Sequence, residues 1–384
     1  MKINIQDRRN CCGCTACSSI CPKDAITMRP DVMGFLYPHI NENLCIDCGL
    51  CVKTCQFHDG YKLYENYNKP MVYGVRHKNE EELAKSQSGA ASWAIIEAFL
   101  DTPGSVYGAT FDTVYHVVHR RATTLEDAQA FRCSKYVQSD LTDVFDKIKV
   151  ELRTGERVLF IGTGCQVAGL KATVPTGLHN LLFTVDIVCH AAPAPAVWAS
   201  FVQFVENKYN KRVISAAFRN KKYGWHSHIE TLEFDDGTPM LESTSFRKLF
   251  YDHVIVRPSC TVCHFTNLKR VSDLTICDFW GWEKYYADWN DNKGVSVLMI
   301  NSSRGAEFFE NLKKYVDYRE SDIVKCFQPQ MGKPISADIK ILKRAERIFA
   351  QKGYVGLSRA YGDKSFKFLF KEYIRPLLKL LRIR

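Results

Sequence analysis

The chain has 384 residues, of which 46% are hydrophobic and 24% are charged, a composition that excludes wholesale disorder and is long enough for two or three domains. The formal net charge of +10 is concentrated in residues 364–384, where seven Lys and Arg side chains accompany one acid, Glu372. We therefore expect no nucleic-acid partner. The sequence has no secretory signal and no apolar run long enough to span a membrane, so we expect a cytoplasmic protein.

The first feature along the chain is a pair of C-x2-C-x2-C-x3-C runs. The first run comprises Cys11, Cys14, Cys17 and Cys21, and the second comprises Cys45, Cys48, Cys51 and Cys55. Bacterial ferredoxins use this spacing because three thiolates of one tight loop cap three corners of a cubane, while the fourth reaches the other cluster. We predict a ferredoxin-like α+β domain over residues 1–60 with two 4Fe-4S clusters and crossed ligation. The first cluster takes three cysteines of the first run and Cys55, and the second takes three of the second run and Cys21.

Two residues of these runs stand apart from the ligand pattern. Gln56 follows the second run, where proline is usual, and Cys12 is left over. We interpret Cys12 as a small buried side chain. The alternative for the eight cysteines is a pair of zinc knuckles, which do not demand a three-cysteine loop with a distant fourth ligand.

A polar linker over residues 58–70 leads to a segment with α/β patterning. Apolar runs predict strands over 71–77, 105–111, 157–162 and 181–190, and helical patterns predict helices over 91–100, 141–155 and from Gln166 onwards. We predict a larger α/β domain over residues 61–335 with a mixed, partly parallel sheet, followed by a helical C-terminal extension over 336–384.

Further cysteines lie at the predicted strand ends. Cys165 follows the strand over 157–162, and Cys189 lies near the end of the run over 181–190. Ligands in open α/β sheets bind beyond the carboxyl ends of parallel strands, so these thiols share one crevice. Cys260 and Cys263 form a chelating pair that completes a set of four for a third 4Fe-4S cluster or a structural zinc ion. The remaining thiols are expected to be buried, and they are Cys133, Cys277 and Cys326.

The end of the chain combines basic and apolar faces. Basic residues spaced three or four apart lie opposite aromatic and leucine side chains, and Pro376 interrupts the pattern. This segment is either a peripheral anchor at the inner surface of an anionic membrane or a helix docked on the protein or a partner.

These motifs together resemble the beta-subunit family of the coenzyme F420 hydrogenases and dehydrogenases. Besides the double ferredoxin run, the resemblance rests on five segments, which are Ser86–Gly89, Ser134–Tyr136, Gly162–Gln166, Asp186–His190 and Arg257–Cys263, and on Asp273–Gly281. It implies a noncovalent FAD in the large domain, a cluster on Cys165, Cys189, Cys260 and Cys263, and electron exchange between the flavin and the N-terminal clusters.

Two loops offer backbone N–H groups for the flavin pyrophosphate. One is Ser88–Gly89 at a helix start, and the other is Gly162, Thr163 and Gly164 at a strand end, followed by Gln166. Both are equally compatible with ordinary helix starts. Lys135 is the expected cation beside the flavin ring, where positive charge stabilises the reduced anion. His190 is the candidate proton carrier, with a core histidine as the alternative.

The sequence thus predicts an oxidoreductase that passes electrons between FAD and 4Fe-4S clusters. Its two-electron substrate is unidentified and a deazaflavin is one candidate. A redox partner protein or a small-molecule donor or acceptor is implied. The alternative is a non-enzymatic electron-delivery or iron-sulfur sensor subunit that lacks flavin.

Overall fold

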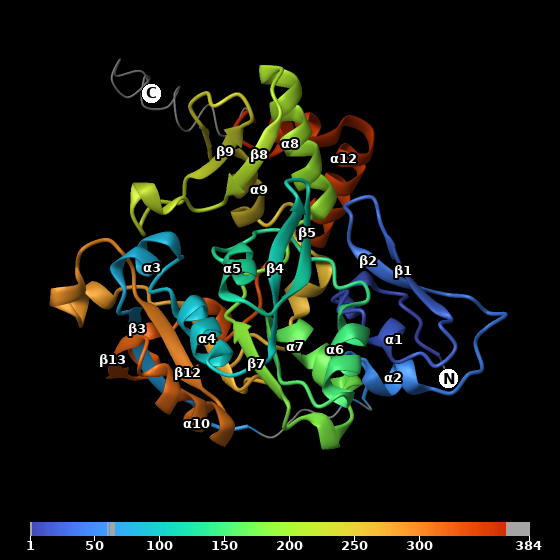
Figure 1. The fold of residues 1–384 in the computed structure, drawn as a ribbon. Helices are drawn as coiled ribbons and strands as arrows, with labels where there is room; N and C mark the ends of the chain where they lie inside the picture. The colour runs from blue at the N-terminus through green and yellow to red at the C-terminus, as the bar shows by residue number, and fades with distance from the viewer. Residues whose placement is uncertain (1, 60, 62–65, 366–384) are drawn as a thin grey trace, which may run out of the picture.

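The computed structural model describes residues 2–59, 61 and 66–365. A small N-terminal region lies at one side of a large α/β body, and a further layer of strands and helices covers one end of that body (Figure 1). The predicted tail over 364–384 falls, from residue 366 on, outside the described residues. No helix of the described part is long and apolar enough to cross a membrane.

The N-terminal region is built around an antiparallel hairpin and two short helices that follow the cysteine loops. Its elements are η1 (Arg8–Asn10), α1 (Ala16–Ser19), β1 (Ile26–Pro30), β2 (Leu36–Ile40) and α2 (Leu50–Thr54). Each cysteine loop reaches its helix through a left-handed residue, Thr15 at φ 65° and Gly49 at φ 76°. This turn places the third cysteine of each run, Cys17 or Cys51, on a helix, and the fourth cysteine follows that helix.

The large body is organised by one sheet formed by eight of the described strands. In spatial order these are β13 (Val316–Ser321), β3 (Met71–His77), β12 (Ser296–Ile300), β11 (Leu274–Asp278), β7 (Leu182–Ile187), β6 (Val158–Thr163), β4 (Ser105–Thr113) and β5 (His116–Ala122). The four strands β4, β6, β7 and β11 are parallel to one another, and the outer pairings are antiparallel. The carboxyl ends of β6, β7 and β11 therefore meet at one edge.

Helices cover both faces of this sheet. They are α3 (Glu80–Lys85), α4 (Ala91–Leu100), α5 (Leu125–Ala128), α6 (Val144–Arg153), α7 (Gly164–Thr173), α10 (Ser303–Leu312) and α11 (Ile323–Cys326). Successive side chains of β6 point to opposite faces of the sheet. Leu159 packs with α4 and α10 on one face, and Phe160 packs with α6 and α7 on the other. Both residues are fully buried, which explains the continuous apolar run in the sequence.

A third layer closes the end of the body near the carboxyl edge of the parallel strands. Its elements are α8 (Pro195–Tyr209), β8 (Val213–Ala217), β9 (Glu230–Phe234), β10 (Leu241–Ser243), α9 (Ser245–Tyr251) and α12 (Ile339–Ala360). Its apolar core includes Met33 and Phe35 from the N-terminal region. The two regions therefore share buried surface instead of meeting through a linker alone.

The predicted fold class is confirmed, with a ferredoxin-like region followed by an α/β body whose sheet is mixed and partly parallel. The predicted strand over 71–77 and the predicted helix over 91–100 coincide with β3 and α4. The helix expected over 141–155 is shorter at both ends: α6 begins at Val144, after the left-handed residue Asp143 (φ 59°), and it ends at Arg153.

Candidate functional site

The cysteines predicted for the first cluster converge beside the large body. Cys11 and Cys17 are buried. Burial and the nearby charges of Cys14, Cys11 and Cys55 raise the pKa of Cys17. Burial and the charges of Cys14 and Cys11 likewise raise the pKa of Cys55 to about 12. The structure thus brings the first loop together with the last cysteine of the second run.

The cysteines predicted for the second cluster share one cavity. Its wall includes Cys21, Cys45, Cys48 and Cys51, together with apolar side chains such as Ile26 and Ile40. Crossed ligation needs Cys21 to face the second run, and that is its position here. Cys48 is exposed, so this group lies nearer to the surface than the first.

The four cysteines of the large body also form one group. Cys165 begins α7, Cys189 follows β7, and Cys260 lies in η5 (Pro258–Val262) just before Cys263. Burial raises the pKa of Cys189 well above its usual value, and the charges of the other three thiols act in the same direction. Within the described residues, no three His, Cys, Asp or Glu side chains are spaced for a single metal ion. A structural zinc ion on these four cysteines stays the alternative prediction, which metal analysis tests.

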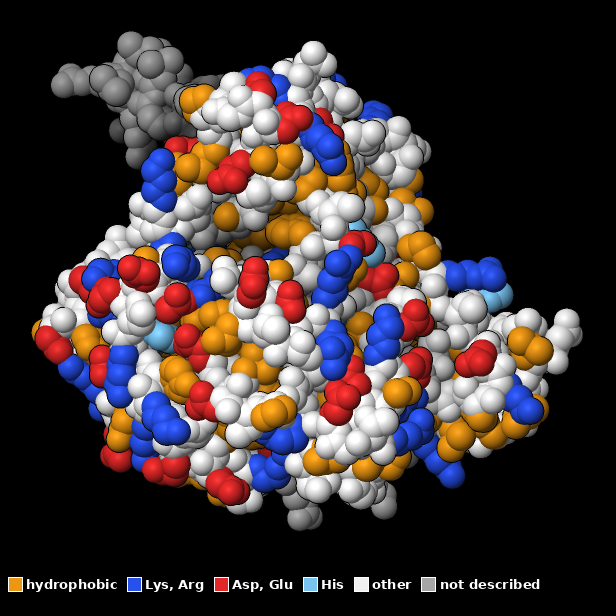
Figure 2. Space-filling model, in the orientation of Figure 1, with side chains coloured by type: hydrophobic (Ala, Val, Ile, Leu, Met, Phe, Trp, Pro, Cys, Tyr) orange, Lys and Arg blue, Asp and Glu red, His pale blue; other side chains and the backbone are white. Residues whose placement is uncertain are grey.

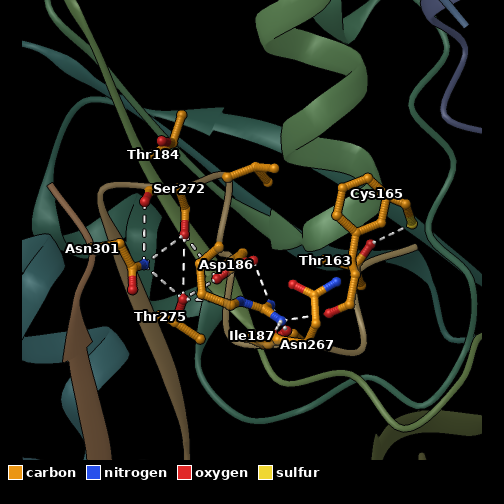
Figure 3. A network of polar contacts seen from close by, with 12 residues as sticks. Thr163, Cys165, Thr184, Asp186, Ile187, Asn267, Ser272, Thr275 and Asn301 are labelled. Atoms are coloured by element: carbon orange, nitrogen blue, oxygen red, sulfur yellow. Dashed lines mark hydrogen bonds and ion pairs between the residues drawn. The ribbon is translucent and has the colours of Figure 1, made fainter. Parts of the chain in front are cut away.

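A buried ion pair holds two of these cysteine loops together. Asp186 lies in β7, three residues before Cys189, and is fully buried. Arg270 donates to its carboxylate and to two main-chain carbonyls in the loop after Cys263, at 2.6 and 3.2 Å. Ser272 donates to the same carboxylate at 2.8 Å, and further hydroxyl and amide groups extend the network (Figure 3). Sequence reasoning missed Arg270, whose partner is 84 positions away.

Cys12 connects the first N-terminal group with the group in the large body. It is buried, as predicted. Its thiol lies beside those of Cys14 and Cys165, and this interaction lowers the pKa of Cys165 to about 7. The Gln56 amide donates to Cys12 Sγ at 3.2 Å and to the Cys165 carbonyl at 3.0 Å. The sequence marked both Cys12 and Gln56 as unusual without indicating this contact.

The polar groups of the Ser88–Gly89 loop are already bonded within the protein. Ser88 Oγ donates to the Val295 carbonyl at 2.7 Å, and Gly89 N–H donates to Ser296 Oγ at 3.0 Å. A Cβ at Gly89 would lie 2.2 Å from the Val75 carbonyl oxygen. This glycine therefore permits the close approach of α4 to β3 and β12.

The second predicted loop borders the large-body cysteines. Gln166 Oε1 accepts from Thr163 N–H at 2.9 Å in a capping box at the start of α7. The Thr163 hydroxyl lies 3.1 Å from Cys165 Sγ. A Cβ at Gly164 would lie 2.9 Å from Phe265 Cβ. Thr163, Gly164 and Gln166 therefore shape the surroundings of Cys165.

Two partly buried lysines lie near an exposed thiol. Lys135 Nζ donates to the carbonyls of Ala130 and Arg132 at 2.8 and 2.6 Å, and burial lowers the pKa of Lys135 to about 8. Lys221, which the sequence analysis missed, also has its pKa lowered to about 8 by burial, and the charge of Cys133 opposes that shift. The predicted burial of Cys133 is wrong, because its left-handed backbone (φ 64°) turns it to the surface. Cys326 is buried and Cys277 is half-buried.

His190 faces an aromatic region at the carboxyl edge of the sheet. Its Nε2 lies 2.9 Å from Nε2 of His253, and its ring packs edge-on against Phe250 and Tyr251. Burial lowers the pKa of His190 to about 4, so the imidazole is neutral at pH 7. It is a neutral hydrogen-bonding group in the resting structure.

An open pocket lies next to these aromatic rings. Its volume is about 360 Å³ and its lining is His228, Thr244, Arg247, Lys248 and Tyr251. Figure 2 shows a hollow with hydrophobic side chains between the third layer and the sheet. Behind Tyr251, the Tyr136 ring packs edge-on against the Tyr251 ring, and Arg219 forms an ion pair with Asp278 at the end of β11. The sequence did not single out Arg219 or Asp278.

Comparisons with known proteins match both parts of the chain. Residues 10–58 match the 4Fe-4S dicluster domain, and residues 155–325 match the family described as the C terminus of the coenzyme F420 hydrogenase/dehydrogenase beta subunit. No curated protein matches the chain significantly. A chain of the xenon-derivatised F420-reducing NiFe hydrogenase complex from Methanosarcina barkeri matches with 16% identity and a TM-score of 0.45, over 74% of this chain and 90% of that chain.

We predict that Asp186→Asn strongly destabilises the protein, by about 3–5 kcal/mol, because it leaves the Arg270 guanidinium buried without its counter-charge. Chemical denaturation of the apoprotein measures the effect. Asp288→Asn is the control, because Asp288 pairs with Arg319 in solvent and its loss should change the midpoint little. Equal midpoints for Asp186→Asn and the wild type would contradict this role of the ion pair.

We predict that Gly89→Ala lowers the free energy of unfolding by about 1–3 kcal/mol, since the added methyl group overlaps the β3 backbone. Gly177→Ala is the matched control, because nothing lies within 4 Å of its added Cβ. Denaturant midpoints of both variants are compared with flavin content. Full stability with selective loss of flavin in Gly89→Ala would instead assign Gly89 to the flavin site.

Proposed function

We propose that the chain is a flavin-dependent iron-sulfur oxidoreductase, because its residues 10–58 match the 4Fe-4S dicluster domain and its residues 155–325 match the C-terminal domain of the coenzyme F420 hydrogenase/dehydrogenase beta subunits. It passes electrons between a two-electron substrate and a redox partner. The observation that carries the proposal is the contact of Cys12 with both Cys14 and Cys165. Cysteine groups of the two domains meet there in the protein interior.

The proposed cofactors are two 4Fe-4S clusters in the N-terminal domain, a third on the large-body cysteines, and FAD. A flavin supplies the exchange between two-electron and one-electron chemistry, which single clusters cannot perform. The donor chemistry fits iron, because each group gathers thiols that can supply thiolate ligands, and a bound cation relieves the repulsion among those thiolates.

The order of the cysteine groups supports a route through the protein. The large-body group lies next to the first N-terminal group through Cys12, and Cys51 of the second group lies near Cys17 and Cys55 of the first. Cys48, at the far side, is exposed. We propose that electrons enter or leave the ferredoxin domain at its first cluster and exchange with a partner protein at its second.

The pocket beside α9 is the proposed place of the flavin ring or the substrate. It combines the cations Arg247 and Lys248 with the aromatic ring of Tyr251, and Phe250 and His190 lie behind that ring. Such a surface suits a planar, anionic molecule. Lys135 adjoins Tyr136 in sequence and remains the proposed cation beside the ring, with His190 as the group that holds a neutral hydrogen bond there.

The second candidate function is electron delivery or iron-sulfur sensing without flavin. It is favoured by the Ser88–Gly89 loop, whose polar groups have partners within the protein. Flavin content separates the two functions.

We predict about twelve iron atoms from three cubanes and one FAD per chain after anaerobic preparation of the full chain. Cys260→Ser should lower the iron content by about one cluster and stop electron passage from substrate-reduced flavin to the remaining clusters. Cys326→Ser is the control, because this buried thiol belongs to none of the ligand groups. Iron near eight in the wild type, or zinc in the third site, would reject the third cluster, and a protein with full iron and no flavin would support the second candidate.

We further propose that residues 364–384 contact an anionic membrane surface and bring the protein beside a membrane-bound partner. Each basic residue near such a surface contributes about 1 kcal/mol, and salt screens this attraction. We predict that the intact chain sediments with anionic vesicles at low salt, less at high salt, and that a chain ending at Asp363 does not. Equal binding of both chains would reject the proposal.

A further inference from the structure

Arg257 is a buried cation at the junction of the ferredoxin domain and the large body. It precedes η5 and is 1% exposed. Its guanidinium donates to the Cys11 carbonyl and the Leu36 carbonyl, both at 2.8 Å, and to Gln138 Oε1 at 2.9 Å. Nη2 also lies 3.6 Å from Cys11 Sγ. The charged group therefore reaches across the junction to a proposed ligand of the first cluster.

Arg257 differs from every other buried arginine of the described chain in lacking a carboxylate partner. The other three form ion pairs, which are Arg76 with Asp291, Arg219 with Asp278, and Arg270 with Asp186. Three hydrogen bonds of Arg257 go to neutral oxygens and a fourth, longer one goes to Cys11 Sγ. The groups whose charges act on it are Cys11, Tyr37, Cys12 and Cys260. Arg257 therefore has thiols near its guanidinium, whereas the other three buried arginines have carboxylates.

A buried charge is costly unless an opposite charge compensates it. Three neutral carbonyl oxygens accept hydrogen bonds from the guanidinium, but they do not compensate its positive charge. Thiolates on iron provide negative charge at the required position. Reduction of the first cluster adds one electron and no proton, so the negative charge beside the guanidinium grows by one unit, and the reduced form gains most from the cation.

The backbone is adapted to this contact. Gly13 has a positive φ of 69°, and a Cβ there would lie 2.7 Å from Arg257 Nη1. The aromatic rings of Tyr37 and Phe35 cover the guanidinium at 4.4 and 5.3 Å. Water is thereby kept from the charge, so its field on the Cys11 side is poorly screened.

We propose that Arg257 is the counter-charge of the first N-terminal cluster and raises the reduction potential of that cluster. The transfer of electrons from the large body to this cluster is thereby favoured. This inference rests on the proposed function only in requiring the N-terminal clusters. Charge and hydrogen bonding near the cluster sulfurs are recognised determinants of such potentials. Arg257 acts through the proposed cluster ligand Cys11 and does not touch the substrate. It is therefore a positioning residue and not a catalytic one.

Three variants test the charge. Arg257→Gln removes it, Arg257→Lys keeps it with fewer hydrogen bonds, and Gln138→Glu retains Arg257 but places a carboxylate at its Nη1. The full chain is prepared anaerobically, and its clusters are followed by EPR during a redox titration with dithionite. The second N-terminal cluster serves as the internal reference.

We expect Arg257→Gln and Gln138→Glu to lower the reduced-to-oxidised ratio of the first cluster at least tenfold at a fixed ambient potential, equivalent to about 59 mV for a one-electron couple. Arg257→Lys should stay near the wild type, and the second cluster should not shift. Arg8→Gln is the matched control, because Arg8 lies over the same Tyr37 ring at 5.5 Å but is exposed and paired with Glu346. It should leave both potentials unchanged.

Several results would overturn the inference. They are unchanged potentials in both Arg257→Gln and Gln138→Glu with full iron content, equal shifts in the Lys and Gln variants, or equal shifts in both clusters. If Arg257→Gln fails to assemble, Gln138→Glu decides the question, since its guanidinium contacts are retained. Absence of flavin or of the third cluster would reject the proposed function without affecting these measurements on the first cluster.

Discussion

The packing of the Cys11–Cys14 loop against the carboxyl edge of β6 and β7 is the contact on which the rest of the structure depends. It places Cys12 between Cys14 and Cys165 and buries the Arg257 guanidinium at the same junction. Thiolates and a cation that are both removed from water attract one another more strongly than they would in solvent. The ferredoxin domain is therefore held in a defined orientation, and Met33 and Phe35 extend the junction into an apolar core.

On the large body, this junction is formed by the carboxyl edge of the parallel strands. Parallel strands end at one edge, so residues from β6, β7 and the loop before β11 meet there. Asp186 and Arg270 then tie the Cys189 and Cys263 loops to each other. A buried ion pair of this kind is a poor source of net stability, but removing one partner is expensive. Its contribution here is to define the positions of the thiols.

Charge is distributed unevenly around the proposed route. Arg219 and Arg270 are neutralised by acids at the sheet edge, whereas Arg257 faces thiols. Lys135 and Lys221 are held by main-chain carbonyls near the surface thiol of Cys133. Cations without carboxylate partners thus stand near sites where redox chemistry is proposed to add negative charge, and the paired arginines have structural roles.

Local patterns in the sequence were sufficient to predict the two cysteine runs, the strand over 71–77, the helix over 91–100 and the mixed, partly parallel sheet, because spacing and periodicity act within a few residues of the chain. The same patterns predicted that Cys165 and Cys189 lie at one edge of the sheet, because each follows a strand and the carboxyl ends of adjacent parallel strands meet at one edge. Local spacing did not reveal that Cys12 and Gln56 reach Cys165, or that Arg270 binds Asp186. Those contacts join residues distant in sequence, and only tertiary packing decides which buried charge meets which partner.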